Sequence, residues 1–300
     1  MDFSSAYTIA DRQTREKIIA ELMSRYGFLC RETIGESRCS RPIEALSIGN
    51  TDKQVLFCGA FHGMEWITSL ILLRFLDDIA HTIKNSESIC GVRIGTFLNK
   101  RGLTVIPCIN PDGVEIAVHG SSAAENYQEL VRSVSGGDTA HWQANAVGVD
   151  INHNFSANWD ELKCLELRHG ICSPAPTRYG GEFAESEPET RTLASYCRTG
   201  QICHALAFHS QGEEIYWDFD DYHDSEALTM AKIMAHSSGY TVSQPDGLAV
   251  GGGFKDWFVR KFRRPAFTIE VGKGVNPLPM AQFDNIYNKI REMLVLAAVL

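Results

Sequence analysis

The sequence predicts an α/β fold, in which helices cover both faces of a largely parallel sheet. Short apolar runs typical of buried strands alternate with amphipathic helical segments along the whole chain. Its 300 residues are enough to bury a sizeable core as one domain. No internal repeat, low-complexity tract or linker interrupts this alternation. We therefore expect a single domain over residues 1–300.

In the first half, apolar side chains recur at helical spacing between Ile9 and Tyr26, and apolar runs such as Gln-Val-Leu-Phe-Cys-Gly-Ala indicate buried strands. A strong turn signal, Asn110-Pro111-Asp112-Gly113, ends the last of these strands. The predicted elements are, in order, a helix over 9–26, strands over 32–36, 43–48 and 54–60, a helix over 65–83 and a strand over 103–109.

The second half begins with an irregular segment, residues 115–185, which is rich in Gly, Ser, Asn and aromatic residues and has little periodicity. Ser186 then caps a helix that has Pro188 and acidic residues in its first turn. The elements that follow are a strand over 205–208, helices over 225–236 and 254–262, a strand over 266–271 and a helix over 280–300.

Composition excludes several classes of protein. Hydrophobic residues make up 44% and charged residues 22% of the chain, as in an ordinary globular protein. The net charge is −9, and the absence of a dense Lys/Arg run argues against a nucleic-acid or anionic-membrane surface. No run of about 18 apolar residues predicts a transmembrane helix. The N-terminus lacks a basic start and an apolar run, so we expect no signal peptide and a cytoplasmic protein.

The nine cysteines argue against a disulfide framework. Their number is odd, and they form no CxxC pair or repeated spacing. The same observations argue against a cysteine-built metal site. We expect buried, reduced thiols.

Residues with metal-binding chemistry follow two of the predicted strands. His62 and Glu65 are three positions apart at a strand-to-helix junction, so both side chains can face one ion, although a capping or surface pair has the same spacing. His209 ends another buried strand, and open α/β sheets bind ligands outside such strand ends. Two His and one Glu are a usual ligand set for a hydrolytic zinc ion. Taken alone, His209 is more typical of a core histidine than of a metal ligand.

Glu270 closes the apolar strand Ala-Phe-Thr-Ile. A carboxylate at such a place is costly unless it is paired or functional. Beside an activated water, with its pKa raised by an apolar wall, it would provide the general base that hydrolysis needs.

These residues resemble those of zinc carboxypeptidases of the carboxypeptidase A type, and the resemblance runs from about residue 40 to the C-terminus. The matching motifs, in family order, are His62–Glu65, Asn110–Gly113, Gly148–Asn154, Ser186-Glu187, His209-Ser210, Asp256-Trp257 and Glu270. The resemblance implies one zinc ion per chain on His62, Glu65 and His209, with Glu270 as general base and acid. It also implies a three-layer α/β/α domain with a mixed sheet of about eight strands. Residues 1–40 would form an N-terminal helix and lead-in strand, and residues 41–300 the catalytic core.

Further stretches are similar to one branch of that family, the γ-D-glutamyl-meso-diaminopimelate peptidase I group, which acts on cell-wall peptides. They are Ala60–Trp66, Trp142–Asn145, Asn152–Phe155, His209–Gly212 with Ile215–Trp217, and Glu270–Gly274 with Asn276–Pro279. Members of this branch often carry peptidoglycan-binding LysM repeats, and none is visible here. The resemblance implies a small peptide substrate, a murein stem peptide.

The sequence departs from the digestive carboxypeptidases at three positions. Where they bind the substrate's terminal carboxylate with an Asn-Arg pair, this chain has Asn152-His153. His replaces neither the permanent charge nor the planar fork of Arg. Gln143 stands in place of an Arg that polarises the scissile carbonyl, and Leu248 in place of a mobile capping Tyr.

Two lysines are candidate substrate cations. By resemblance, Lys255 occupies the position that sets side-chain specificity, with a solvated helix lysine as the less favoured alternative. Lys273 lies in the glycine turn after Glu270. Either would suit a substrate rich in carboxylates.

The sequence thus predicts a zinc-dependent peptidase that cleaves the γ-D-glutamyl–meso-diaminopimelate bond of stem peptides. A zinc-activated water would attack the carbonyl, Glu270 would transfer the proton, and Gln143 would help to hold the oxyanion. Two alternatives remain open. One is an ordinary metallocarboxypeptidase that releases C-terminal residues, and the other is an inactive zinc-holding module that binds peptides.

Overall fold

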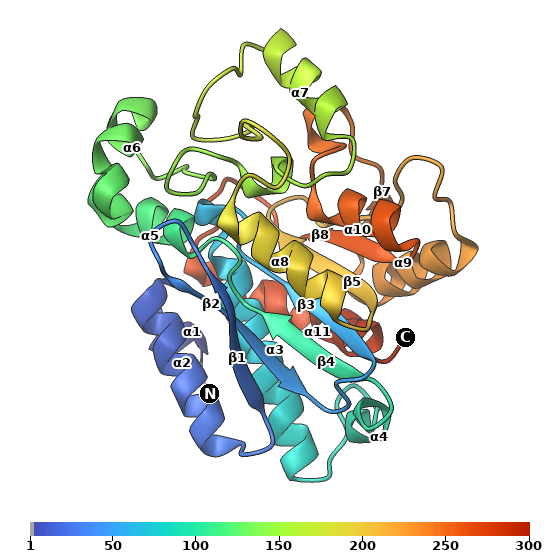
Figure 1. The fold of residues 1–300 in the computed structure, drawn as a ribbon. Helices are drawn as coiled ribbons and strands as arrows, with labels where there is room; N and C mark the ends of the chain where they lie inside the picture. Colours follow the sequence, from blue (N-terminus) through green and yellow to red (C-terminus); the bar gives the residue numbers. More distant parts are fainter. Residues whose placement is uncertain (1–2) are drawn as a thin grey trace.

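An eight-stranded mixed sheet runs through the middle of the molecule in the computed structural model, which describes residues 3–300 (Figure 1). Its strand order is β1-β2-β4-β3-β5-β8-β6-β7. The strands are β1 (Cys30–Glu36), β2 (Pro42–Ile48), β3 (Gln54–Cys58), β4 (Gly102–Ile106), β5 (Ile202–His209), β6 (Glu214–Tyr216), β7 (Thr241–Ser243) and β8 (Ala266–Glu270). The predicted fold class, a three-layer α/β/α domain with a mixed sheet of eight strands, is confirmed.

The centre of the sheet is parallel, and antiparallel pairs join it to the outer strands, of which β6 and β7 pair in parallel with each other. β4, β3, β5 and β8 pair in parallel, β2 and β1 are added antiparallel at one edge, and β6 pairs antiparallel with β8 at the other. Every residue of β3 and β4 is buried, because helices cover both faces of the parallel part.

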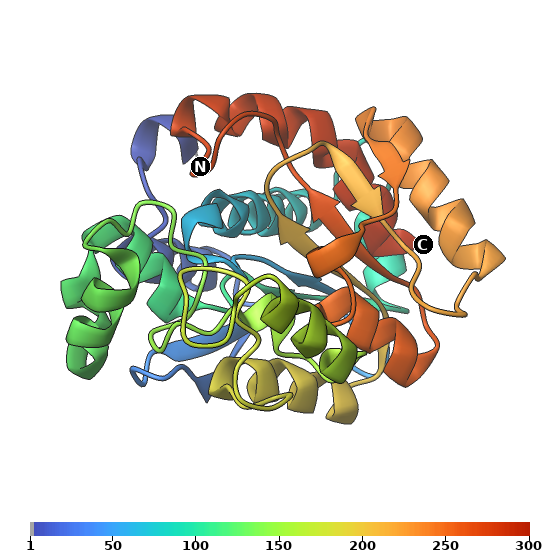
Figure 2. The same cartoon turned by 90° about the horizontal axis from the view of Figure 1, so that it is seen from above.

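Helices pack against both faces of this sheet (Figures 1 and 2). α3, α9 and α11 lie on one face, where α11 contacts both of the others, and α8 and α10 lie on the opposite face. α5 and α6 lie at the left of Figure 1, and α7 lies at its top. The helices are α1 (Phe3–Ala6), α2 (Arg12–Arg25), α3 (Ile67–Lys84), α4 (Ile94–Leu98), α5 (Pro111–His119), α6 (Gln128–Ser135), α7 (Trp159–Arg168), α8 (Pro188–Thr199), α9 (Ser225–Ser238), α10 (Phe254–Phe262) and α11 (Phe283–Val299).

The region expected to be irregular, residues 115–185, contains α6 and α7, so that expectation is wrong in part. The predicted turn at Asn110–Gly113 is instead the start of α5, because the Asn110 side chain accepts a hydrogen bond from the Gly113 amide at 2.8 Å and caps the helix. The strands β6 and β7, three residues each, were not predicted.

Ser186 does not cap α8. The capping position is Glu187, and the Ser186 hydroxyl donates a hydrogen bond to the Glu187 carboxylate at 2.9 Å. Pro188 lies in the first turn, as predicted, and is the first residue of the helix.

The cysteines are unpaired, but only three of the nine are buried, namely Cys58, Cys108 and Cys197. The expectation of buried thiols therefore holds for these three alone. No helix in residues 3–300 is both long enough and apolar enough to cross a membrane.

The strand order brings the predicted functional residues together. β4 and β5 lie on opposite sides of β3, with α3 on one face and α8 on the other, so the carboxyl ends of β3 and β5 border a crevice. His209 ends β5 and Glu270 ends β8, and the two residues are direct partners across the parallel pair. His62 follows β3 by four residues.

Candidate active site

A sharp turn after β3 places His62 and Glu65 at the crevice. The short 3₁₀ helix η1 (Gly63–Glu65) donates hydrogen bonds to a distant segment, since the Gly63 amide donates to the Gln143 carbonyl at 3.1 Å and the Met64 amide to the Trp142 carbonyl at 2.9 Å. A Cβ on Gly63 would lie 2.1 Å from the Gly113 carbonyl oxygen, so only glycine fits. The turn is therefore fixed by tertiary contacts and holds Glu65 buried below His62.

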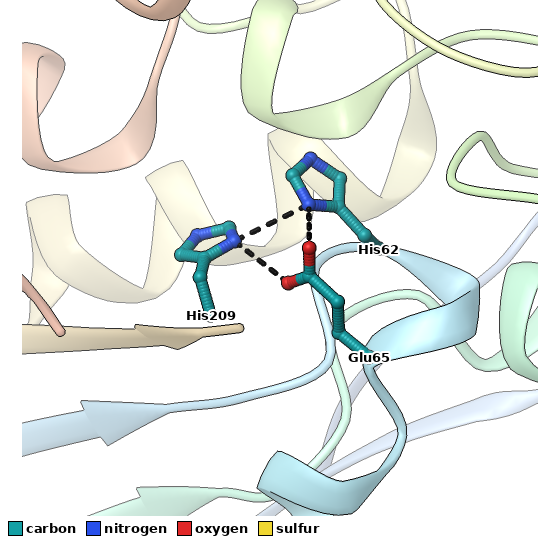
Figure 3. Close-up of side chains that lie close together, drawn as sticks. All are labelled: His62, Glu65 and His209. Atoms are coloured by element: carbon teal, nitrogen blue, oxygen red, sulfur yellow. Dashed lines mark hydrogen bonds and ion pairs between the residues drawn. The ribbon is translucent and has the colours of Figure 1, made fainter. Parts of the chain in front are cut away.

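The side chains of His62, Glu65 and His209 converge on one point (Figure 3). His62 Nδ1 lies 2.9 Å from one oxygen of Glu65, and His209 Nδ1 lies 3.1 Å from the other. The two Nδ1 atoms are 3.3 Å apart.

This donor set fits a zinc ion. Two imidazole nitrogens and a carboxylate face each other. Their lone pairs point toward one another and repel unless a proton or a cation lies between them. Burial opposes ionisation of Glu65, but the charge of His62 and a hydrogen bond from His209 outweigh it and lower the pKa of Glu65 to about 2. The carboxylate is thus ionised and ready to bind a metal.

A second carboxylate, Asp150, orients His62 from behind. Its Oδ1 lies 3.1 Å from His62 Nε2, which leaves Nδ1 facing Glu65 and His209. Burial opposes ionisation of this carboxyl as well, yet the nearby His62 and His153 together hold its pKa below the usual value. Metal-binding histidines commonly have such a partner on the other ring nitrogen. No role was predicted for Asp150, although its place within the motif Gly148–Asn154 was a signal for one.

Glu270 lies beside the trio at the end of β8. Burial raises the pKa of its carboxyl well above the usual value, and the negative charge of Glu65 raises it further. Glu214, its partner on β6, adds to the effect. A carboxyl with a raised pKa can take up a proton near neutral pH, as a general base must.

A cavity of about 500 Å³ opens above these residues. Its lining includes His62, His209 and Glu270 together with four of the predicted substrate and transition-state residues, namely Gln143, Asn152, His153 and Lys255. Leu248, which stands where the capping Tyr was expected, also lines it. So does Tyr216, whose hydroxyl donates to Glu214 at 2.7 Å.

Hydrogen bonds fix the polar side chains of the wall. The Oε1 atom of Gln143 accepts a hydrogen bond from the Thr177 hydroxyl, so its amide nitrogen is the donor left for a ligand. Asn152 Oδ1 accepts from the Phe254 amide at 3.0 Å. His153 Nδ1 lies 3.0 Å from the fully buried carboxylate of Glu166, which Lys163 also contacts at 3.1 Å.

The two predicted substrate lysines lie in different surroundings. Lys255 is buried rather than solvated, and its ammonium is 2.6 Å from Asp256 and donates to the Asp218 carbonyl. Lys273 is not among the residues that line the cavity. It is 69% exposed and forms an ion pair with Glu213 at 3.2 Å.

Comparisons with known proteins identify the family. Residues 16–293 match the family described as zinc carboxypeptidase. This chain is a member of that family. As a zinc carboxypeptidase it is a metallopeptidase, in agreement with the sequence prediction.

Among the relatives of this zinc carboxypeptidase is the gamma-D-glutamyl-L-diamino acid endopeptidase 1 of Lysinibacillus sphaericus. It is 36% identical over 273 residues, which cover 90% of this chain and 67% of the relative. Human carboxypeptidase B is 26% identical over 263 residues, covering 81% and 58%. The fold is shared with bovine thrombin-activatable fibrinolysis inhibitor, with a TM-score of 0.74 at 18% identity over 97% of this chain and 96% of the other.

Proposed function

We propose that this zinc carboxypeptidase hydrolyses peptidoglycan stem peptides between D-glutamate, linked through its γ-carboxyl, and meso-diaminopimelate. The observation that carries the proposal is the 36% identity, over 90% of the chain, to an endopeptidase named for the γ-D-glutamyl–diamino acid bond. One zinc ion per chain would be held by His62, Glu65 and His209.

The wall around His153 supports an endopeptidase rather than a digestive-type carboxypeptidase. A carboxypeptidase of that type needs a permanently charged fork for the terminal carboxylate. At this position the chain has a histidine whose Nδ1 faces buried Glu166. The Glu166 carboxylate is shared with Lys163, so His153 belongs to an ionic network of the protein itself.

The chain's own residues account for proton transfer and for the position of the carbonyl. Zinc, when bound, supplies a Lewis acid that activates water and polarises the scissile carbonyl. Glu270 removes a proton from the attacking water and passes it to the leaving amine, and its raised pKa suits both steps. The amide nitrogen of Gln143, oriented by Thr177, donates a hydrogen bond to the carbonyl oxygen as negative charge develops there.

Turnover of two substrates by the zinc-loaded protein tests the proposal. One is the murein tripeptide L-Ala-γ-D-Glu-meso-diaminopimelate, and the other is a hippuryl-type carboxypeptidase substrate. Release of diaminopimelate from the tripeptide, with little hippurate, is the expected result. Preferential hippurate release would identify an ordinary carboxypeptidase instead, and no turnover of either would identify a peptide-binding module.

A further inference from the structure

A guanidinium that the sequence analysis did not single out enters the same cavity as the metal trio. Arg178, in the segment between α7 and α8, lines the cavity together with His62, His209 and Glu270. Within residues 3–300 its side chain forms no hydrogen bond or ion pair, and it is exposed. Lys255, by contrast, already has Asp256 as its partner. The charge of Arg178 is therefore available to a ligand.

The backbone of Arg178 is attached to the metal site. Its amide donates to Asp150 Oδ2 at 2.9 Å, and the other oxygen of that carboxylate contacts His62 Nε2. Arg178 has φ = 66°, a left-handed backbone conformation that is costly for residues other than glycine. The hydrogen bond to Asp150 helps to hold it there, so the start of the side chain is fixed relative to the metal ligand.

Arg178 also enters the cavity beside the proposed carbonyl donor. The preceding residue, Thr177, donates its hydroxyl hydrogen bond to Gln143. A cation next to Gln143 therefore lies close to the substrate residue whose carbonyl group is attacked.

The proposed substrate has an anion at that place. A D-glutamate linked through its γ-carboxyl keeps a free α-carboxylate on the acyl side of the scissile bond. An ordinary α-linked residue has no carboxylate there, because the same group forms the peptide bond. The planar fork of arginine matches a carboxylate with two parallel hydrogen bonds.

We infer that Arg178 determines specificity for the γ-glutamyl linkage by binding the free α-carboxylate of the D-glutamate. This inference rests on the proposed function and adds to it the residue that recognises the acyl side. It is distinct from Lys255, which the sequence suggested as the substrate cation.

Two substrates that differ only at this group test the inference. They are L-Ala-γ-D-Glu-meso-diaminopimelate and its D-isoglutamine counterpart, in which the α-carboxylate is an amide. The variants are Arg178→Gln, Arg178→Lys and, as a matched control, Arg168→Gln on the exposed end of α7, outside the cavity. Gln and Lys both carry a Cβ, so backbone strain at position 178 is unchanged.

The wild-type chain is expected to prefer the carboxylate substrate. Arg178→Gln should lower kcat/KM for that substrate about tenfold to a hundredfold, as expected for loss of a charge-assisted contact, and barely change it for the amide. Arg178→Lys should restore part of the preference, and Arg168→Gln should keep all of it. Calorimetric titration in a Glu270→Gln background, in which turnover is slowed, should give the same pattern in Kd.

The outcomes separate this inference from the proposed function. If the wild type cleaves the tripeptide but Arg178→Gln keeps the full preference for the carboxylate, the inference is wrong and the function stands. Equal losses on both substrates would likewise overturn it, since they would assign Arg178 a structural role. If the wild type cleaves neither substrate, the proposed function is wrong and the inference falls with it.

Discussion

Asp150 places one carboxylate oxygen 3.1 Å from Nε2 of His62, on the side of the ring opposite Glu65. Its second oxygen accepts the backbone amide of Arg178 at 2.9 Å. One buried carboxylate thus fixes both the ring orientation of the predicted metal ligand His62 and the position of the Arg178 backbone in the cavity wall. Asp150 belongs to the motif Gly148–Asn154, but the motif by itself indicates neither role.

Asp150→Asn should weaken zinc binding about tenfold to a hundredfold, the usual cost of changing a residue that orients a metal-binding histidine. In asparagine an NH₂ group replaces one of the two carboxylate oxygens, and this group cannot accept the hydrogen bond that His62 or Arg178 makes at that position. Competition with a chelator measures the zinc Kd. The exposed Asp284→Asn on α11 is the control, and equal affinities for the two variants would contradict the role given to Asp150.

The zinc content should be about one ion per chain, and His209→Ala should abolish it. His209 supplies one of the three converging ligand atoms and is buried, so no neighbouring side chain can take its place without rearrangement. Elemental analysis after dialysis measures the content. His236→Ala, an exposed position on α9, should keep its zinc, whereas full zinc in His209→Ala would remove His209 from the ligand set.

The parts of the site predicted from sequence are those that adjoin buried strands. His209 and Glu270 each end an apolar run that predicts a buried strand. Parallel strands have their carboxyl ends at the same edge of a sheet, so the two residues can be expected to lie at one edge from these runs alone. The family resemblance then supplied their roles. Asp150 and Arg178 lie in the segment 115–185, whose path is set by contacts with distant residues, so local pattern gave them no position.

The same distinction applies to the fold. Strands β3, β5 and β8 are buried apolar runs and were predicted. Strands β6 and β7 have three residues each, which is too short for a hydrophobic periodicity to be recognised in the sequence. α7 buries only Leu162 and Glu166, so it shows no broad apolar stripe. The cap of α5 was mistaken for a turn, because Asn-Pro-Asp-Gly is typical of both.

Glu270→Gln should keep zinc and the fold but lose roughly 10²–10⁴-fold in kcat, the usual contribution of a general base. The amide preserves the shape of the side chain and removes its ability to accept a proton. Steady-state kinetics and a zinc assay on the same sample measure both properties. Glu32→Gln on the exposed strand β1 is the control, and a Glu270→Gln variant as active as the parent would require another base.

Lys255→Met should reduce stability and lower kcat/KM to a similar degree on every substrate. The ammonium is buried and lies 2.6 Å from Asp256, so its removal leaves a buried carboxylate without its cation. Such a loss costs about 3–5 kcal/mol. Thermal unfolding and kinetics on the two tripeptides measure the effects. A loss confined to the carboxylate substrate, with unchanged stability, would instead make Lys255 a substrate cation.

Glu189 should make the fold less stable as the pH rises. This carboxyl lies in the first turn of α8 with no exposed surface, and burial, followed by the charge of Asp112, raises its pKa from 4.5 to about 8. Between these two values the folded chain keeps a proton that the unfolded chain has lost. The free energy of unfolding therefore falls as the pH rises from about 4.5 to about 8.

Glu189→Gln should remove this loss, because the amide resembles the protonated carboxyl and cannot ionise. The variant should match the wild type near pH 4.5 and exceed its free energy of unfolding at pH 9 by a few kcal/mol, since one unit of pKa shift corresponds to about 1.4 kcal/mol. Denaturant unfolding across this range measures it. The neighbouring Glu187→Gln should act in the opposite direction, since Glu187 is paired with Arg38 at 2.9 Å and its removal destabilises the fold. Parallel pH profiles for Glu189→Gln and the wild type would show that Glu189 is already ionised in the folded chain.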